Sequence, residues 1–440
     1  MPPDTRTPKL APIIGLGRLV GLTFAVIAPG SSVFLTYGTA FAQAGTGIVF
    51  GYGLGALLNL TMMWCYAELG SRYPEAGGDY SLASRALGRW AGSLYAVLFA
   101  VKGAAIPGLL ALSSAQYIHL VWPPIPATPL ALAVFASYIA LAGFDLKTSS
   151  TVVNLMVAIE FLVFLMFVVT GLTHLHQPAS VLWTPQRAVG EGGLSRVPRG
   201  VWLGAATAAL YGLNGPQACL YYSEETLASP KHIGRTIFGA ALTTVGIEMA
   251  GVIIGTLSLP TLASSTNMPL AAMMHQALGP AGRLVMLLGI GVALYDTGLA
   301  TTMSYGRIFY AIARDAQWPG ILNRVMSRIS RTGVPIGALL VLGSVNMAVM
   351  ASSSIQVLVT LGGTLLMVVY AGIAIASILD RIRQRRAPYQ MPWWPIPPLA
   401  ALAGLALLVV HLSRFHLILT GLVTLLGLTW AWASPILRDL

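Results

Sequence analysis

Residues 18–44 read RLVGLTFAVIAPGSSVFLTYGTAFAQA, an apolar run interrupted at its centre by the segment 28–32, APGSS. The run is long enough to cross a membrane, which takes roughly 20 residues of helix. Proline removes a backbone donor and glycine destabilises a helix, so the pattern predicts that the chain leaves the helical path midway. Unwound backbone at membrane depth is tolerated only where it is buried in protein or lines a wet cavity.

A second apolar run, residues 200–223, contains the interruption 211–216, YGLNGP. Pro216 suits the first turn of a restarted helix, where its missing donor costs nothing. At such a break, free N–H groups at the start of the second half-helix attract a carboxylate, and loosened carbonyls attract a cation. We therefore expect a small-molecule site where the two interruptions meet.

The composition places both runs in a polytopic membrane protein. Of 440 residues, 56% are hydrophobic and 9% are charged, against about 25% charged residues in a typical soluble domain. A water-soluble fold and a fused soluble domain are excluded. A 20-residue window predicts an all-α protein with twelve spans. These spans are 18–44, 47–69, 88–117, 127–144, 151–173, 200–223, 235–258, 281–304, 335–352, 355–379, 396–413 and 415–434.

The basic residues predict the orientation. With a cytoplasmic N-terminus, nineteen of the 25 Lys and Arg residues fall in cytoplasmic segments and five on the other side, with Lys102 inside a span. Such a bias is the usual topology signal of inner segments, so both termini are expected in the cytoplasm. The net charge of +11 therefore gives no reason to expect a nucleic-acid partner. The partners that we expect are the lipid bilayer and a small molecule.

The positions of the interruptions predict an internal repeat. The first opens spans one to five and the second opens spans six to ten, so the second block enters the membrane with opposite orientation. The expected organisation is a tail (1–17), a first repeat (18–173), a connector outside the cytoplasm (174–199), a second repeat (200–379) and two further spans with a short tail (380–440).

Three segments resemble the amino acid–polyamine–organocation (APC) superfamily of permeases. Residues 67–80, AELGSRYPEAGGDY, are similar to its A-E-L-x-x-x-x-P-x-x-G-G-x-Y signature. Residues 223–235, SEETLASPKHIGR, are similar to its E-E-x-x-x-P-x-x-x-x-R segment. Residues 305–315, YGRIFYAIARD, are similar to its R-x-x-Y-A-M-A-R-D segment.

The resemblance implies a leucine-transporter-type fold, in which a 5+5 inverted repeat with helices 1 and 6 broken is followed by two extra helices. It also implies secondary transport of amino acids or related amines across a bacterial inner membrane, without ATP or another cofactor. In the family, amides of the first break hold the substrate carboxylate, and the matching residues here are Gly30, Ser31 and Ser32. Both breaks depart from the family pattern, with Gln217 in the slot that is acidic in relatives.

Taken together, the breaks and their flanks give the expected substrate-binding residues. Their mixture of bulk and a neutral amide favours a zwitterionic or weakly basic substrate over a strongly acidic one. The expected residues are Phe24, Ala28, Gly30, Ser31, Ser32, Tyr211, Leu213, Asn214, Gly215 and Gln217.

Ionisable groups inside a span are expensive and are functional candidates by default. Four are expected at membrane depth: Lys102, Glu160, Glu248 and Asp296. Many proton-coupled relatives carry a Lys on helix five and an acidic residue on helix three, so the resemblance implies that Glu160 and Lys102 exchange these positions. Glu160 could exchange a proton, bind Na⁺, pair with a substrate ammonium, or form a structural ion pair with Lys102.

Several alternatives stay open from the sequence. Hydroxyls of Thr301, Thr302 and Ser304 are compatible with a Na⁺ site, although such residues also serve helix packing; no other metal site is expected. Glu248 and Asp296 are candidates for ion or proton coupling or for satisfied polar contacts. A polyamine permease, a Na⁺ symporter and a non-transporting amino-acid sensor are further readings. No catalytic motif is visible, so we do not expect an enzyme.

Overall fold

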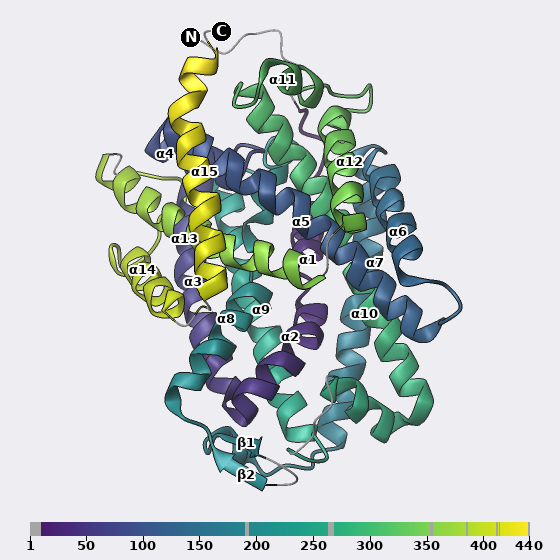
Figure 1. Cartoon of the computed structure of the whole chain (residues 1–440). Coiled ribbons are helices and arrows are strands. Elements are labelled where there is room, and N and C mark those ends of the chain that lie inside the picture. The colour runs from purple at the N-terminus through teal and green to yellow at the C-terminus, as the bar shows by residue number, and fades with distance from the viewer. Residues whose placement is uncertain are drawn as a thin grey trace.

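The computed structural model describes residues 10–189, 193–262, 268–352, 355–383, 386–410, 412 and 414–438. These residues are mainly helical, as expected for an all-α membrane protein (Figure 1). The α-helices are α1 (Leu16–Ile27), α2 (Pro29–Ala44), α3 (Ile48–Arg72), α4 (Asp79–Leu87), α5 (Arg89–Val121), α6 (Ala127–Ala142), α7 (Leu146–Thr173), α8 (Trp202–Gly212), α9 (Pro230–Ser258), α10 (Pro269–Arg314), α11 (Gly320–Met326), α12 (Ile336–Ser352), α13 (Ile355–Arg383), α14 (Ile396–Val409) and α15 (Arg414–Arg438).

Length and apolar composition make seven helical stretches within the described residues candidates to cross a membrane. They are Leu16–Arg72, Arg89–Val121, Leu146–Thr173, Pro230–Ser258, Pro269–Arg314, Leu365–Arg383 and Arg414–Ala433. Ala127–Ala142, Ile336–Ser352 and Ile396–Val409 are apolar helices of shorter length. The protein is therefore an integral membrane protein.

The first interruption is narrower than the sequence predicts. Only Ala28 leaves the helix, in the left-handed region at φ 45° and ψ 64°, and α2 resumes at Pro29. A residue before proline is pushed out of the helical region, and proline is pre-organised for a first helical position. The expectation that residues 29–32 also leave the helical path was wrong, because one residue suffices for the turn.

The second interruption follows the prediction more closely. Helix α8 ends at Gly212, and a 3₁₀ segment, η4 (Pro216–Tyr222), begins with Pro216 in its first turn. Gly215 has a φ of 134°, a conformation that costs little only in glycine. Both breaks thus consist of a residue at positive φ followed directly by proline.

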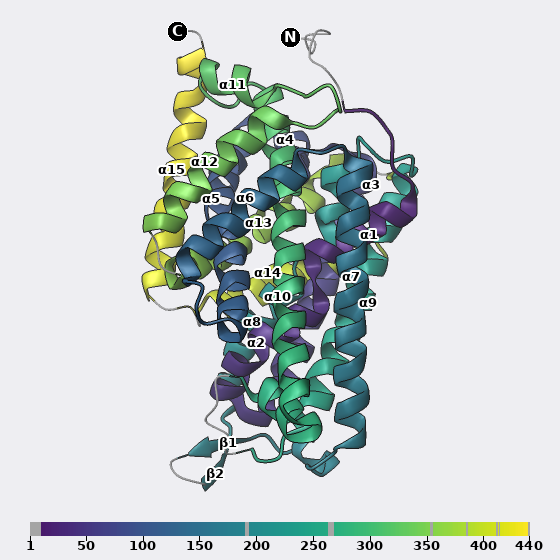
Figure 2. The same ribbon diagram turned by 90° about the vertical axis from the view of Figure 1, so that its right-hand side faces the viewer.

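The two ends of the molecule differ in structure. Helix α11 and the last turn of α15 lie at one end, which we call the terminus end (Figure 1). The opposite end, the hairpin end, carries a two-stranded antiparallel sheet of β1 (Gln186–Val189) and β2 (Gly193–Arg196), with Gln186 opposite Arg196. This hairpin lies in the connector 174–199 and was not predicted. Figure 2 shows α1 and α2 meeting at an angle between these ends.

The broken segments pack against each other in the interior. Helix α1 contacts η4 and α2 contacts α8, while α10 contacts both α1 and α2. Helix α10 is buried along most of the segment from Gly289 to Ala313. A kink at Gly279, before Pro280, separates this segment from the first turns of α10. The breaks therefore lie side by side against one continuous helix.

Candidate functional site

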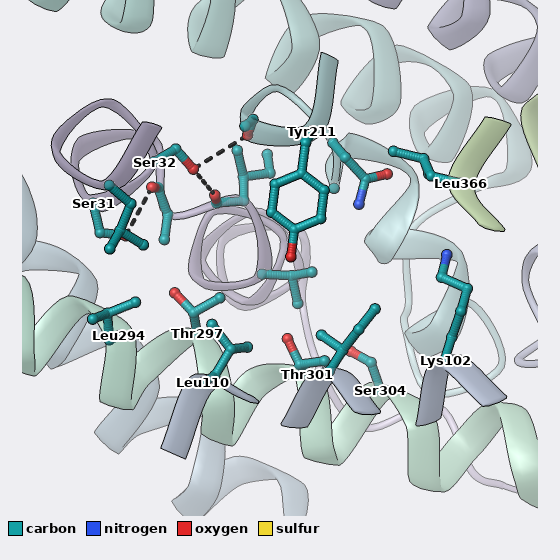
Figure 3. A pocket seen from close by; sticks show the side chains of 18 of the residues that line it. Ser31, Ser32, Lys102, Leu110, Tyr211, Leu294, Thr297, Thr301, Ser304 and Leu366 are labelled. Atoms are coloured by element: carbon teal, nitrogen blue, oxygen red, sulfur yellow. Dashed lines mark hydrogen bonds between the residues drawn. The ribbon is translucent and has the colours of Figure 1, made fainter. Parts of the chain in front are cut away.

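A cavity of about 130 Å³ lies where the two breaks meet. Its lining comes from the ends of α1 and α8, the start of α2 and one face each of α5 and α10 (Figure 3). Seven of the ten expected binding residues line it: Ala28, Ser31, Ser32, Tyr211, Asn214, Gly215 and Gln217. The remaining lining residues are Val26, Ile27, Leu35, Thr36, Lys102, Ile106, Leu110, Gly212, Tyr221, Leu294, Thr297, Thr301, Ser304, Tyr305 and Leu366.

The other three expected residues contact protein instead. Phe24 packs edge-on against Phe161 of α7, with ring centroids 5.8 Å apart. The buried carbonyl of Leu213 accepts a hydrogen bond of 3.2 Å from the Nδ2 atom of Asn59. Gly30 faces Glu160, and a Cβ added at Gly30 would lie 3.1 Å from Oε1 of that side chain.

Glu160 accepts hydrogen bonds from backbone amides of the first break. Its Oε1 atom accepts hydrogen bonds from the backbone N–H groups of Gly30, at 2.9 Å, and Ser31, at 3.0 Å. The N–H of Ser32 donates to the carbonyl of Ala28 at 2.9 Å. The start of a helix favours a negative charge, and here a side chain of α7 supplies it. The three amides therefore have partners within the protein.

Ser32 joins the two breaks. Its hydroxyl lies within hydrogen-bond distance of the carbonyls of Ile27, at 3.1 Å, and Gly212, at 3.2 Å. These carbonyls belong to the last residues of α1 and α8, where a helix carries partial negative charge. The side of the cavity formed by the breaks thus presents backbone acceptors.

Helix α10 supplies hydroxyls at helical spacing. Thr297, Thr301 and Ser304 all line the cavity (Figure 3). The hydroxyls of Thr297 and Ser304 also donate to the carbonyls of Ala293 and Ala300 within α10, both at 2.8 Å. Thr302 points elsewhere and donates to the carbonyl of Gly298 at 2.7 Å, as a residue one position off a helical stripe must. Thr301 and Thr302, two of the hydroxyl residues considered as Na⁺ ligands, therefore do not face the same site.

Lys102 extends from α5 on the side of the cavity opposite Ser31 and Ser32 (Figure 3). It is 6% exposed, and its ammonium lies 5.0 Å from the centre of the Phe99 ring. No ion pair or hydrogen bond joins it to Glu160 within the described residues. The structural ion pair considered from the sequence is not formed.

Three buried carboxylates lie behind the breaks. Glu248 on α9 and Asp296 on α10 are both close enough to Glu160 for their charges to interact. Both oxygens of Glu248, both of Asp296 and Oε2 of Glu160 find no hydrogen-bond partner in the described part of the chain. Satisfied polar contacts therefore do not account for Glu248 or Asp296.

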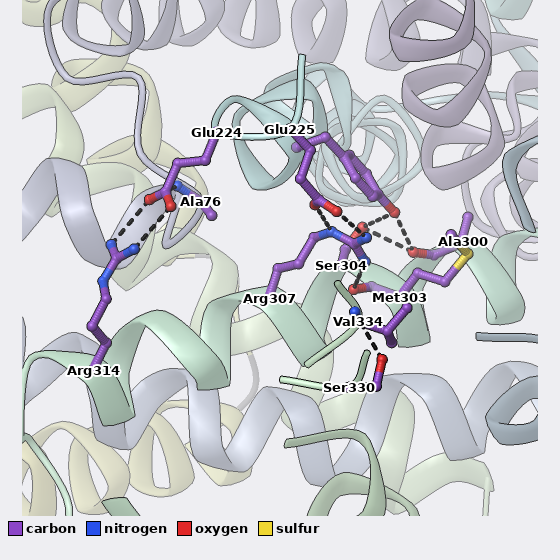
Figure 4. A network of polar contacts seen from close by, with 11 residues as sticks. Ala76, Glu224, Glu225, Ala300, Met303, Ser304, Arg307, Arg314, Ser330 and Val334 are labelled. Carbon is purple, nitrogen blue, oxygen red and sulfur yellow. Dashed lines mark hydrogen bonds and ion pairs between the residues drawn. The ribbon is translucent and has the colours of Figure 1, made fainter. Parts of the chain in front are cut away.

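Two ion pairs link the segment that follows η4 to α10 (Figure 4). Arg307 of α10 pairs with Glu225, which follows η4, and its Nη2 donates to Oε1 of Glu225 at 3.0 Å. About two helical turns further on, Arg314 donates to both oxygens of Glu224, at 2.8 and 3.0 Å. The guanidinium of Arg307 also covers the Tyr222 ring at 4.6 Å. All four of these charged residues lie in segments that resemble the family.

A second cavity, of about 580 Å³, continues from the first toward the hairpin end. The two share the lining residues Leu35, Thr36, Leu110, Tyr211 and Leu366. Farther along, the second cavity is lined by residues near the outer ends of α2, α8 and α10, namely Gln43, Gly204 and Met268. The second cavity thus connects the first cavity with the part of the molecule near the hairpin end.

Sequence comparison agrees with a membrane transporter. The family described as amino acid permease matches residues 14–424. An uncharacterized transporter of Mycobacterium tuberculosis is 29% identical over 390 residues, which cover 86% of this chain and 81% of the relative. The branched-chain amino acid permease BcaP of Bacillus subtilis is 22% identical (94% and 90% covered). The gamma-aminobutyric acid permease of Escherichia coli is 23% identical (84% and 81% covered).

The fold and the cavity between two broken helices define an integral membrane transporter, and the family match covers almost the whole chain. The chain belongs to the amino acid permease family of the APC superfamily. It is a transporter and not an enzyme.

Proposed function

We propose that this protein is a secondary transporter that carries amino acids or related amines across the bacterial inner membrane. The observation that carries the proposal is the cavity at the meeting point of the two breaks. Polar backbone at that depth has to be satisfied within the protein or by a bound molecule. The names of relatives point to branched-chain amino acids and gamma-aminobutyric acid as the first compounds to test.

In the proposed arrangement, the chain crosses the membrane twelve times and both termini face the cytoplasm. Residues 18–173 and 200–379 form two repeats of opposite orientation, followed by two helices within 380–440. The hairpin end then faces outward and the terminus end faces the cytoplasm. The connector 174–199 lies on the outer side.

The proposed mechanism is alternating access. With Arg307 and Arg314 paired to Glu225 and Glu224, the path to the cytoplasm is closed. Substrate enters through the second cavity and passes Tyr211, which lines both cavities. Rocking of α1, α2, α8 and η4 against the remaining helices then separates the ion pairs and opens the cytoplasmic side.

Uptake into sealed proteoliposomes tests this function. Purified protein should accumulate or exchange labelled leucine, valine or gamma-aminobutyric acid, and empty liposomes should not. Binding of these compounds in the absence of any uptake or exchange would contradict transport and favour a sensor.

Coupling to protons is proposed to run through Glu160, with Glu248 and Asp296 as neighbouring carboxylates. A charged carboxylate oxygen without a hydrogen-bond partner, such as Oε2 of Glu160 among the described residues, is energetically costly in an apolar interior. Binding of a proton removes that charge. Protonation of Glu160 would also weaken its hold on the amides of Gly30 and Ser31, because hydrogen bonds to a charged acceptor are about twice as strong. The proton would thus be linked to the geometry of the first break.

Glu160→Gln is expected to flatten the dependence of uptake rate on pH and to abolish substrate-driven proton movement. The amide oxygen of glutamine can still accept from Gly30 and Ser31, so the break keeps its geometry while the charge is lost. Glu160→Ala serves as a control that removes both the charge and the acceptor, and it should also lower the melting temperature.

The measurement is uptake between pH 5 and 8, repeated with Na⁺ replaced by N-methyl-D-glucamine. An unchanged pH profile in Glu160→Gln would contradict the role of Glu160. Loss of uptake on Na⁺ replacement would show that Na⁺ is the coupled ion.

A further inference from the structure

The first cavity contains a single charge, and that charge is positive. Among its described lining residues, Lys102 is the only Lys, Arg, His, Asp or Glu. The ammonium is buried, and its described surroundings supply the Phe99 ring but no carboxylate within ion-pair distance. The nearest charge that acts on it is that of Asp79 on α4, which lies outside the cavity lining. A buried, unpaired cation is costly. A ligand that carries an anionic group would offset this cost.

The first break cannot hold that anionic group. Its amides at Gly30 and Ser31 already donate to Glu160, and the amide of Ser32 donates to Ala28. On the cavity side, the hydroxyl of Ser31 lies 3.1 Å from the carbonyl of Ala28, and that of Ser32 lies near two further carbonyls. This side of the cavity is rich in acceptors, which repel a carboxylate and attract an ammonium group.

We propose that Lys102 binds the carboxylate of an amino acid substrate, whose ammonium group faces the carbonyl ends of α1 and α8. The proposal rests on the transport function proposed above and specifies its substrate class. The charges of Glu160 and Lys102 together set the orientation of a bound zwitterion. Its ammonium group lies toward the negative charge behind the breaks, and its carboxylate lies toward the positive charge on α5. The same cation disfavours diamines and polyamines, because like charges repel strongly in a low-dielectric site.

The test compares ligands that differ only in the carboxylate. L-leucine is compared with L-leucinamide and isopentylamine, and gamma-aminobutyric acid with 4-aminobutanamide and propylamine. Binding to purified wild-type protein, Lys102→Met and Lys102→Arg is measured by competition and by thermal shift, and uptake is measured in proteoliposomes. Removing one partner of a buried charge pair predicts a loss of at least about 30-fold in affinity for the acids.

We expect the wild type to prefer at least one acid over its amide and amine, and Lys102→Met to lose that preference. Lys102→Met should leave the weak binding of the amides unchanged, and Lys102→Arg should retain the preference for the acid. The unliganded Lys102→Met protein should melt at a higher temperature than the wild type, because the substitution removes an unpaired buried charge. A merely structural lysine would produce the opposite change.

Equal binding of acids and amides to the wild type would overturn the proposal, as would an acid preference that survives in Lys102→Met. If the amines are bound and carried better than the acids, the protein is a transporter but the role of Lys102 is wrong. If no compound is bound or carried, both this inference and the proposed function are wrong.

Discussion

Thr301→Trp is expected to abolish substrate binding and transport while leaving the protein folded. The Thr301 side chain points into the first cavity, whose volume is about 130 Å³ (Figure 3). An indole at this position occupies the space in which we place the substrate. Overpacking of a protein interior costs about 1–3 kcal/mol even where neighbours shift, and the same cost imposed on the bound state would be roughly 5- to 150-fold in affinity. We expect the loss to reach the upper end of this range, because the cavity is small.

Thr301→Ser is the matched control, because it keeps the hydroxyl and removes only a methyl group. Uptake by Thr301→Ser should stay near the wild-type rate. Size-exclusion chromatography and thermal unfolding in detergent show whether Thr301→Trp is folded. A folded Thr301→Trp protein that still transports at the wild-type rate would exclude the first cavity as the binding site.

Arg307→Met is expected to produce the largest loss of stability. Arg307 and Glu225 are 2% and 3% exposed, so the substitution leaves a buried carboxylate without its partner. Breaking a buried pair in this way costs about 3–5 kcal/mol. The double variant Arg307→Met/Glu225→Leu should regain much of this loss, because neither charge is then left unpaired.

The exposed pair Arg85–Glu75 provides a control for this prediction. Its side chains are 51% and 25% exposed, and a surface pair is worth about 0–1 kcal/mol. Thermal unfolding in detergent should therefore place Arg85→Met close to the wild type and Arg307→Met far below it. Equal effects of the two substitutions would contradict the assignment of Arg307–Glu225 as the buried link between η4 and α10.

The sequence predicts the breaks well because their cause is local. A proline disfavours the helical conformation for the residue before it, so the interruptions at Ala28 and Gly215 have a cause contained in two adjacent residues. The extent of the first break is predicted less well. After the turn at Ala28, a regular helix begins at Pro29, and Gly30 to Ser32 belong to it.

The cavity lining is predicted only in part. Single residues were chosen without the residues that lie beside them on the same helical face. Thr301 implies Leu294 and Thr297, which lie on the same face of α10 at spacings of seven and four, yet only Thr301, Thr302 and Ser304 were expected there. Similarly, Ile106 lies four residues after Lys102 on the same face of α5, so a cavity lined by Lys102 is expected to include Ile106. The second residue of the expected pair, Thr302, lies off this face and bonds within its own helix.

The partner of Glu160 could not be predicted from the sequence. The residue lies 130 positions from Gly30, and only the packing of α7 against α1 and α2 brings them together. A carboxylate within an apolar span is energetically costly, which makes Glu160 a candidate functional residue. The sequence does not indicate that this carboxylate accepts hydrogen bonds from the backbone amides that were expected to bind the substrate. The hairpin β1–β2 was not predicted for a related reason, since two strands of four residues each are too short to carry a clear sequence pattern.

The most direct test of the central claim is an experimental structure of the protein with a transported amino acid bound. The account predicts density for the ligand in the first cavity, between Ser32 and Lys102 and beside Tyr211, with its carboxylate on the ammonium of Lys102. Density confined to the second cavity, or unbroken helices through Ala28 and Gly215, would contradict it.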